Sequence, residues 1–473
     1  MQRRNIILLS TVILAAFIFM LPEVFSTIPG WPGYGISSFI KLNDPVIALT
    51  HVNVIDGTGA DPLRDGTLII ANGKIHSLSS AVGAIVPPGA KILNLSGYTI
   101  IPGLVGMHDH MFYPVGNSGG YKEMGFSFPR LYLANGVTTI RTAGGIVPAT
   151  DLKLKSQIDR GWLAGPEMHV SGPYLDGGLN PGQARNTVDE WADKGVTSFK
   201  AYMHLSNSSL AAAISEAHKR SFKLTAHLCA VGFREAAALG IDNLEHGIVV
   251  DTEFDPDKRP DVCPDRADSE IALYRLNLSS APVQEMIQDL VARHIAVTST
   301  LPVFETYVPF RSPADARSLA AMSSSARRDY FNARSYVTLK TQARWLDLFN
   351  KEMQFERDFV KAGGLLLAGE DPTGNGGVLA GFGDQRELEL LVEAGFTPIQ
   401  AIHIATANGA EFLGEINRIG TIAVGKQADL VVIKGDPSAR ISDIENVELV
   451  FKNGVGFDAA KLILSVHGSV GSR

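Results

Sequence analysis

The sequence has few cysteines and no excess of positive charge. Only Cys229 and Cys263 occur in 473 residues. They are too few for a disulfide framework and are not spaced like metal ligands. Lys and Arg number 42 against 49 Asp and Glu, a net charge of −7, and no basic stripe is present. We therefore expect no nucleic-acid partner. With 45% hydrophobic and 19% charged residues, the composition predicts a globular chain rather than a disordered one.

One long apolar run stands at the N-terminus. Arg3 and Arg4 precede an apolar stretch over residues 6–21, and small residues follow near Ser26. This layout is typical of a secretory signal. Because the run is only slightly short for a membrane span, an uncleaved anchor is the alternative. We expect residues 1–26 to be a signal peptide or anchor. The protein is then periplasmic or secreted, or held in the membrane through this segment alone.

The rest of the chain is long enough for a large domain and a smaller companion. Residues 27–45 are rich in Gly, Pro and Ser and predict a linker. Short β-branched runs separated by turns, such as Asn72-Gly73, occupy residues 46–102. A similar pattern returns at 420–465. We expect both segments to form one composite domain, of which a β-sandwich is the simplest form.

The middle of the chain, residues 103–419, alternates short apolar runs with helical patterns, which is typical of parallel βα units. Eight strand-like runs lie at 100–110, 137–142, 167–172, 197–202, 224–227, 243–246, 296–300 and 365–369. Eight such units predict an α/β fold with a (β/α)8 barrel. In a barrel of this kind the chemistry lies at the C-terminal ends of the strands.

Side chains suited to metal binding occur at these strand ends. His108 and His110 flank Asp109, so alternation along a strand turns both imidazoles to the same side. Lys200 lies in the last part of the fourth run, His227 and His246 end the fifth and sixth runs, and Asp371 follows the eighth. Core packing explains any single buried histidine, but it explains this combination poorly. The set predicts a metal site.

Four motifs carry a resemblance to a known family. They are Ile-Asp-Gly-Thr-Gly at 55–59, Ile-Pro-Gly-Leu at 101–104 before His108-Asp109-His110, Leu-Glu-His-Gly at 244–247, and Gly-Lys-Gln-Ala-Asp-Leu at 425–430. Through them the chain resembles the amidohydrolase superfamily over nearly all of its mature length. It is most similar to the branch of prolidase-like carboxypeptidases, which carries a lysine on strand four.

The resemblance implies a role for each member of the set. His108, His110 and Asp371 would bind the more buried of two divalent metal ions, and His227 and His246 the second. Lys200 would carry a carboxylate derived from CO2 and bridge the two ions. Such ligands suit Zn2+, and comparable sites accept Mn2+ or Co2+. Asp371 would also move the proton during hydrolysis.

The sequence departs from the family pattern at two positions. Gly106 stands where an acidic residue is common, and Glu370 stands where a small or hydroxyl residue is common. Neither change removes a ligand, but each would alter the groups that orient the ligands.

Three further residues are candidates for substrate binding. Arg141 would clamp a substrate carboxylate, or else form a salt bridge at the barrel rim. Tyr202 would polarise a carbonyl, and His204 would touch substrate unless it is an ordinary loop histidine. Aromatic side chains in the loops would line an apolar pocket: Phe112, Tyr113, Tyr121, Phe304, Tyr307 and Phe310. The insertion at 252–276 would cover the barrel mouth as a lid.

These observations predict hydrolysis of an amide bond, peptide-like or in an N-acyl amino acid, in a small and fairly apolar substrate. A lactonase or carboxylesterase using the same site is the nearest alternative, and a non-catalytic scaffold is the second. A deaminase is disfavoured because Ala230, not Glu, lies three residues after His227. The expected partner is a small molecule, and the sequence leaves a homo-oligomer open.

Overall fold

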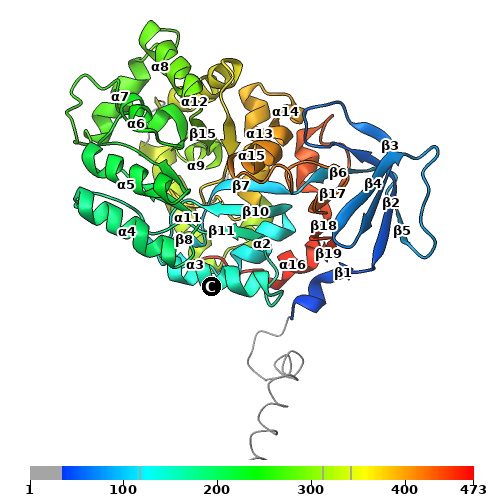
Figure 1. Ribbon diagram of the computed structural model, residues 1–473. Coiled ribbons are helices and arrows are strands. Elements are labelled where there is room, and N and C mark those ends of the chain that lie inside the picture. Colours follow the sequence, from blue (N-terminus) through cyan, green and yellow to red (C-terminus); the bar gives the residue numbers. More distant parts are fainter. Residues whose placement is uncertain (1–34, 117–118, 312–313, 341–343) are drawn as a thin grey trace, which may run out of the picture.

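The computed structural model describes residues 35–116, 119–311, 314–340 and 344–473, which form a mixed α/β fold (Figure 1). The predicted signal or anchor, residues 1–26, lies outside the described residues. Among the helices that are described, none combines the length and the hydropathy that a membrane span requires.

Strands from both ends of the chain form one nine-stranded sheet, where the blue and red strands of Figure 1 lie side by side. Its order is β1-β19-β18-β17-β6-β2-β3-β4, and β5 pairs with β2. The strands from the first part are β1 (Ile40–Leu42), β2 (Val46–Val54), β3 (Leu63–Ala71), β4 (Lys74–Ser80), β5 (Lys91–Asn94) and β6 (Tyr98–Pro102). The last part adds β17 (Leu430–Lys434), β18 (Val447–Lys452) and β19 (Val455–Asp458). Buried side chains of both parts, such as Leu68 and Phe451, share one apolar cluster.

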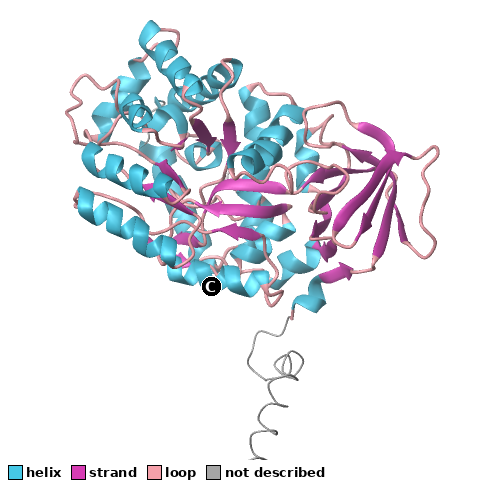
Figure 2. Ribbon diagram, in the orientation of Figure 1, coloured by secondary structure: helices cyan, strands magenta, loops and turns pink. Residues whose placement is uncertain are grey.

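The middle of the chain contains two parallel sheets (Figure 2). The first has the order β11-β10-β7, and the second runs from β12 to β16 in sequence order. Their strands are β7 (Leu104–Asp109), β10 (Val137–Thr142), β11 (Glu167–His169), β12 (Ser198–Ala201), β13 (Lys223–Ala226), β14 (Asn243–Glu245), β15 (Ala296–Ser299) and β16 (Leu366–Ala368). All residues of β7, β10 and β12 are buried, as expected for parallel strands covered by helices.

Backbone contacts connect the two parallel sheets at both edges. A parallel bridge joins Ser171, just after β11, to Ser198 of β12. At the other edge, the amide of Asp371 donates a hydrogen bond of 3.0 Å to the carbonyl of His108. The C-terminal ends of the strands therefore lie around one region.

Helices follow most of these strands. They are α2 (Phe128–Ala134), α3 (Pro148–Asp159), α4 (Pro181–Asp193), α5 (Asn207–Lys219), α6 (Phe233–Leu239), α7 (Arg266–Arg275), α8 (Ala281–Ala292), α9 (Leu301–Glu305), α10 (Ala316–Ala321), α11 (Ser324–Lys340), α12 (Arg344–Lys361), α13 (Phe382–Ala394), α14 (Pro398–His403), α15 (Gly409–Phe412) and α16 (Ala459–Ser465). The start of α14 shows how sequence sets a boundary. Thr397 caps it through a reciprocal pair with Gln400, and Pro398 occupies the first turn.

The predicted strand at 100–110 is corrected by the structure, because it consists of two strands in different sheets. β6 pairs with β17, whereas β7 pairs with β10. Gly103 lies between them, where a Cβ atom would come within 2.0 Å of Thr138 Oγ1. Only glycine fits this close passage from one sheet to the other. The change of sheet places His108 and His110 at the end of a parallel strand.

Candidate metal centre

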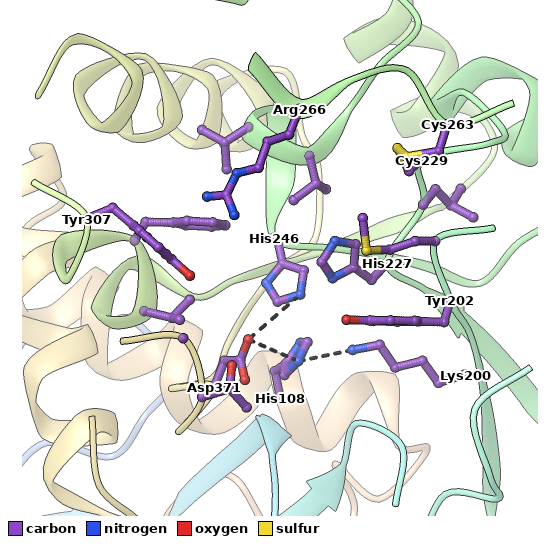
Figure 3. A pocket seen from close by; sticks show the side chains of 18 of the residues that line it. His108, Lys200, Tyr202, His227, Cys229, His246, Cys263, Arg266, Tyr307 and Asp371 are labelled. Carbon is purple, nitrogen blue, oxygen red and sulfur yellow. Dashed lines mark hydrogen bonds and ion pairs between the residues drawn. A yellow bond between two sulfur atoms is a disulfide. The ribbon is translucent and has the colours of Figure 1, made fainter. Parts of the chain in front are cut away.

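Six side chains from the C-terminal ends of the strands line one cavity of about 450 Å³ (Figure 3). They are His108 and His110 at the end of β7, Lys200 in β12, His227 after β13, His246 after β14 and Asp371 after β16. The structure thus brings together the whole set that the sequence placed at strand ends.

Asp371 lies at the centre of the histidines. Its Oδ2 atom is 3.8 Å from His108 Nε2 and 3.9 Å from His246 Nε2, and its Oδ1 atom is 3.5 Å from His110 Nε2. His108, His110 and Asp371 each offer one ligand atom within 4.8 Å of the others. The ring of His227 lies 4.5 Å from that of His246. These separations suit donors around a shared cation.

The far nitrogen of three imidazoles is held by another group. His108 Nδ1 lies 2.8 Å from Glu245 Oε2, His110 Nδ1 lies 3.1 Å from the Gly144 carbonyl, and His246 Nδ1 lies 2.7 Å from Thr300 Oγ1. These contacts fix each ring and direct its Nε2 atom toward the cavity, the usual arrangement of metal-binding histidines.

The protonation of these groups also fits a metal site. Burial lowers the pKa values of His108, His110, His227 and His246, which favours the neutral, ligating imidazole. The buried Oδ1 atom of Asp371 has no hydrogen-bond partner among the described residues. A buried carboxylate oxygen without a partner is costly, and a bound cation would satisfy it.

Lys200 points into this group of imidazoles. Its side chain is buried, and its Nζ atom lies 3.0 Å from His108 Nε2. Burial lowers the pKa of Lys200 to about 8, which increases the fraction of neutral amine near neutral pH. A neutral amine is the form that reacts with CO2.

Arg141 does not occupy the predicted position at the substrate. It is fully buried at the end of β10 and does not line the cavity. Its Nη2 atom forms an ion pair of 2.5 Å with Glu245, and its Nη1 atom donates to Thr225 Oγ1. Because Glu245 in turn holds His108, the guanidinium orients a ligand. The alternative of a salt bridge agrees with the structure, although the pair is buried rather than at the rim.

The positive charges around Glu245 determine its ionisation. Burial opposes the charged form, but the charge of Arg141 and the hydrogen bond with His108 outweigh it and hold the pKa of Glu245 well below its usual value. The sequence analysis missed Glu245 as a functional residue. Its position next to the candidate ligand His246 could have drawn attention to it. Nothing in the sequence, however, shows that its side chain contacts His108 at the end of β7.

The other candidates for substrate binding divide into two groups. Tyr202 lines the cavity, with its ring 5.1 Å from that of His227. His204 lies outside the cavity, with a side chain that is 57% exposed and 3.5 Å from Asp176.

Of the predicted aromatic lining, Phe112, Tyr121, Phe304 and Tyr307 face the cavity. Tyr113 and Phe310 do not, because the first is buried in the core and the second is exposed to solvent.

The insertion after β14 forms one wall of the cavity. Its residues 252–265 form a loop and α7 follows, and Cys263, Arg266 and Glu270 of this segment line the cavity. The two cysteines, to which spacing alone gave no role, form a disulfide between Cys263 and Cys229. Cys229 lies two residues after His227, so the bond fastens the insertion next to a candidate ligand.

Gly106 and Glu370, the two positions that depart from the family pattern, both contribute to a buried cluster of carboxyl groups. The carboxyl groups of Asp109, Glu370 and Asp384 lie together in the interior. A Cβ atom at Gly106 would lie 2.0 Å from Asp109 Oδ2, so glycine there leaves room for the carboxyl group. Burial, and then the neighbouring Asp384, raises the pKa values of Asp109 and Glu370 well above the usual range. The surroundings of these two groups therefore favour the protonated form.

Comparisons with known proteins agree with the geometry. The sequence model of the amidohydrolase family matches residues 361–455. A dihydroorotase from Syntrophus aciditrophicus (strain SB) is 36% identical over 84 residues, which are 18% of this chain and 19% of that protein. The chain therefore aligns with about a fifth of that relative.

Solved structures share the fold over most of the chain. A putative prolidase from Bifidobacterium longum covers 89% of this chain and 98% of its own length, with a TM-score of 0.64 and 23% identity. A bottromycin amidohydrolase covers 91% of both chains, with a TM-score of 0.67 and 20% identity. A Xaa-Pro dipeptidase with bound methionine covers 87% of this chain and 100% of its own, with a TM-score of 0.64 and 18% identity.

Proposed function

Since the chain belongs to the amidohydrolase superfamily, we propose that it is a metal-dependent hydrolase of amide bonds. The substrate is a small and fairly apolar molecule, peptide-like or an N-acyl amino acid. The observation that carries this proposal is the convergence of four imidazoles, a lysine and a carboxylate on one cavity.

The same proposal extends to the architecture. We infer that the two parallel sheets are one closed (β/α)8 barrel over residues 103–419. The bridge between Ser171 and Ser198 and the hydrogen bond from Asp371 to His108 support closure at the two edges. Residues 46–102 and 420–465 then form a composite β-sandwich domain, which the shared apolar cluster of the two segments supports.

We propose that the site holds two divalent cations, with Zn2+ favoured and Mn2+ or Co2+ accepted. His108, His110 and Asp371 would hold one ion, and His227 and His246 the other. Lys200, carboxylated by CO2, would bridge them. When bound, the ions supply Lewis acidity, which polarises a carbonyl group and makes water nucleophilic near neutral pH. The donors fit this cofactor because the Nε2 atoms are directed into the cavity and Asp371 Oδ1 lacks another partner.

The protein's own groups position the substrate and move the proton. Asp371 lies within 4 Å of three imidazoles and opens onto the cavity, so it can accept a proton from water and deliver it to the leaving nitrogen. Tyr202 lines the wall beside His227 and would orient the carbonyl group. The buried pair of Arg141 and Glu245 keeps His108 in the ligating orientation.

The cavity lining supports a small, fairly apolar substrate. Aromatic and aliphatic side chains form much of the wall, among them Phe304, Tyr307, Trp345, Val250 and Ile146. A space of about 450 Å³ accommodates a molecule of the size of a dipeptide or an acylated amino acid. We therefore propose a small-molecule substrate rather than a folded protein.

We also propose that the protein acts outside the cytoplasm, in the periplasm or as a secreted or anchored protein. The disulfide between Cys229 and Cys263 supports this location, because disulfides persist in oxidising compartments. The N-terminal pattern of Arg3, Arg4 and an apolar run supports it independently.

The function is tested with a panel of N-acyl amino acids, dipeptides, lactones and aryl esters. We expect hydrolysis of the amides, loss of activity on chelation, and recovery with Zn2+, Mn2+ or Co2+. His246→Ala should abolish activity, whereas His204→Ala, outside the cavity, should not. Turnover of lactones or esters alone would replace the amide proposal with the lactonase or esterase alternative. A chain that binds no metal and cleaves nothing would be a scaffold.

A further inference from the structure

Arg266 is a cation at the wall of the cavity that no part of the proposed function uses. It is the first residue of α7, in the insertion, and it lines the cavity with Ser269 and Glu270. Figure 3 shows its guanidinium group directed into the cavity, on the side of Tyr307 and His246. The insertion thus presents a positive charge toward the candidate metal centre.

Aromatic rings and a carboxylate hold this guanidinium in place. Its central carbon lies 5.3 Å from the ring centroid of Tyr307 and 5.8 Å from that of Trp345. Its Nε atom donates to Glu270 Oε1 at 3.0 Å. Glu270 takes the Nε–H group, and the guanidinium also forms a side-chain hydrogen bond with Tyr307. Of the five N–H donors of an arginine, the terminal amino groups therefore keep donors for a ligand. Their planar geometry suits a carboxylate.

Among the described residues, Lys200 and Arg266 are the cationic side chains that line the cavity. Lys200 is 1% exposed and contacts His108, whereas the side chain of Arg266 is 68% exposed. An incoming anion can therefore reach Arg266 first.

The position of Arg266 is fixed by its neighbours along the chain. Asp265 caps the start of α7 by accepting a hydrogen bond of 2.8 Å from the Ala267 amide. The disulfide at Cys263 ties the preceding residues to the loop after β13. An exposed salt bridge between Arg266 and Glu270 stabilises a helix only slightly. Helix stability alone therefore does not account for an arginine directed into the cavity.

We propose that Arg266 is a specificity-determining residue that binds a carboxylate of the substrate. The inference rests on the proposed function, since it states where the carboxylate end of the same substrate binds. The carboxylate lies at the wall formed by α7, and the scissile amide lies at the histidines. The substrate carboxylate thus binds at Arg266 of the insertion, whereas Arg141 is already paired with Glu245.

The kinetic test compares an N-acyl amino acid with the matched N-acyl amino carboxamide. Arg266→Gln should lower kcat/KM for the acid by about 10- to 100-fold, mainly through KM, because a hydrogen-bonded charge pair is lost. The neutral carboxamide should change by less than about threefold. Arg275→Gln is the control, because Arg275 ends the same helix but does not line the cavity. Equal losses on both substrates would overturn the proposal.

A binding test separates this inference from the proposed hydrolysis. N-benzylglycine and N-benzylethanolamine contain no amide bond and carry the same ammonium group, but only the first has a carboxylate. Their affinities for the metal-loaded full chain can be measured by calorimetry. We expect the preference for the acid to fall by about tenfold or more in Arg266→Gln and to persist in Arg275→Gln. If Arg266→Gln keeps the full preference, the inference is wrong even when amides are hydrolysed. If the preference depends on Arg266 but no amide is cleaved, the inference stands and the proposed function fails.

Discussion

At the scale of single residues, Glu245 connects a buried cation to a candidate metal ligand. Its two carboxylate oxygens contact Arg141 and His108. Glu245→Gln would leave the Arg141 charge buried without its counter-ion, so we expect a loss of about 3–5 kcal/mol in the free energy of unfolding. The weaker orientation of His108 should also lower metal affinity by about 10- to 100-fold. Chemical denaturation and metal competition measure the two effects.

The control for this substitution is Glu448→Gln. Glu448 forms an ion pair with Lys41 in which both side chains are more than 40% exposed, and such pairs contribute little to stability. Wild-type metal affinity in Glu245→Gln would show that His108 does not need this carboxylate.

Asp371 is expected to be both a ligand and the group that moves the proton. Asp371→Asn keeps the size of the side chain but removes the base, so kcat should fall by about 10²–10⁴-fold. Steady-state kinetics and metal analysis on the same preparation test this prediction. Turnover near that of the wild type, with metal retained, would exclude Asp371 from the mechanism.

Glu356 in α12 is a buried carboxyl group whose charge depends on pH. Burial raises its pKa to about 8, well above the ordinary value of about 4.3. Stability from this group is therefore fully present below the unfolded-state pKa and is lost as pH rises through the folded-state value. Glu356→Gln removes this titration, so the decrease in Tm between about pH 5 and about pH 9 should be smaller by at least about 2 °C. Thermal unfolding across this range measures it, and parallel curves would contradict it.

The sequence predicted the placement of His108, Lys200 and Asp371 because each lies at or just after the end of an apolar run, and ends of parallel strands meet at one edge. It could not predict the role of Arg141. That residue also ends a strand, but whether its side chain faces the mouth or an adjacent strand depends on partners such as Glu245, far away in the chain. The sequence analysis missed Arg266 for the same reason, because the aromatic rings that pack against its guanidinium group, Tyr307 and Trp345, come from two other segments.

At the scale of elements, the insertion is expected to control access to the cavity. The disulfide of Cys229 and Cys263 closes a segment with a sequence separation of 34 residues. Replacing both cysteines by serine should lower the free energy of unfolding by about 4 kcal/mol. It should also raise KM, because the wall that carries Arg266 loses its covalent attachment. Metal content should stay unchanged.

A second variant has a shortened loop over residues 252–262 and keeps both cysteines and α7. The same quantities are measured on it. Denaturation, metal analysis and KM for several substrates distinguish the outcomes. Unchanged KM for every substrate would show that the insertion is only a surface element.

Strand positions were predictable from the sequence because short apolar runs are bounded by turn residues. The run at 100–110 was misread because its hydrophobicity continues through Gly103. The change of sheet there follows from contact with Thr138, which only the fold brings close. The disulfide was unpredictable for the same reason, since only the packing of the insertion on the loop after β13 brings Cys263 to Cys229.

At the scale of the whole molecule, strands from the two ends of the chain pair in one sheet that lies beside the part with the candidate metal centre (Figure 1). β6 pairs with β17 along five residues, and Arg418 contacts both oxygens of Glu167 at the start of β11. The sequence indicated β-rich segments at both ends. Which strands pair across more than 300 residues depends on long-range packing that short patterns do not encode.

The metal content of the wild type and of two Lys200 variants is the most direct test of the central claim. We expect about two divalent ions per wild-type chain. Lys200→Ala should bind less metal and be nearly inactive, with partial recovery when short carboxylic acids replace the missing bridge. Lys200→Arg should fail equally, because a permanent positive charge repels cations and cannot carry CO2. Full activity and full metal content in Lys200→Arg would contradict the dinuclear site.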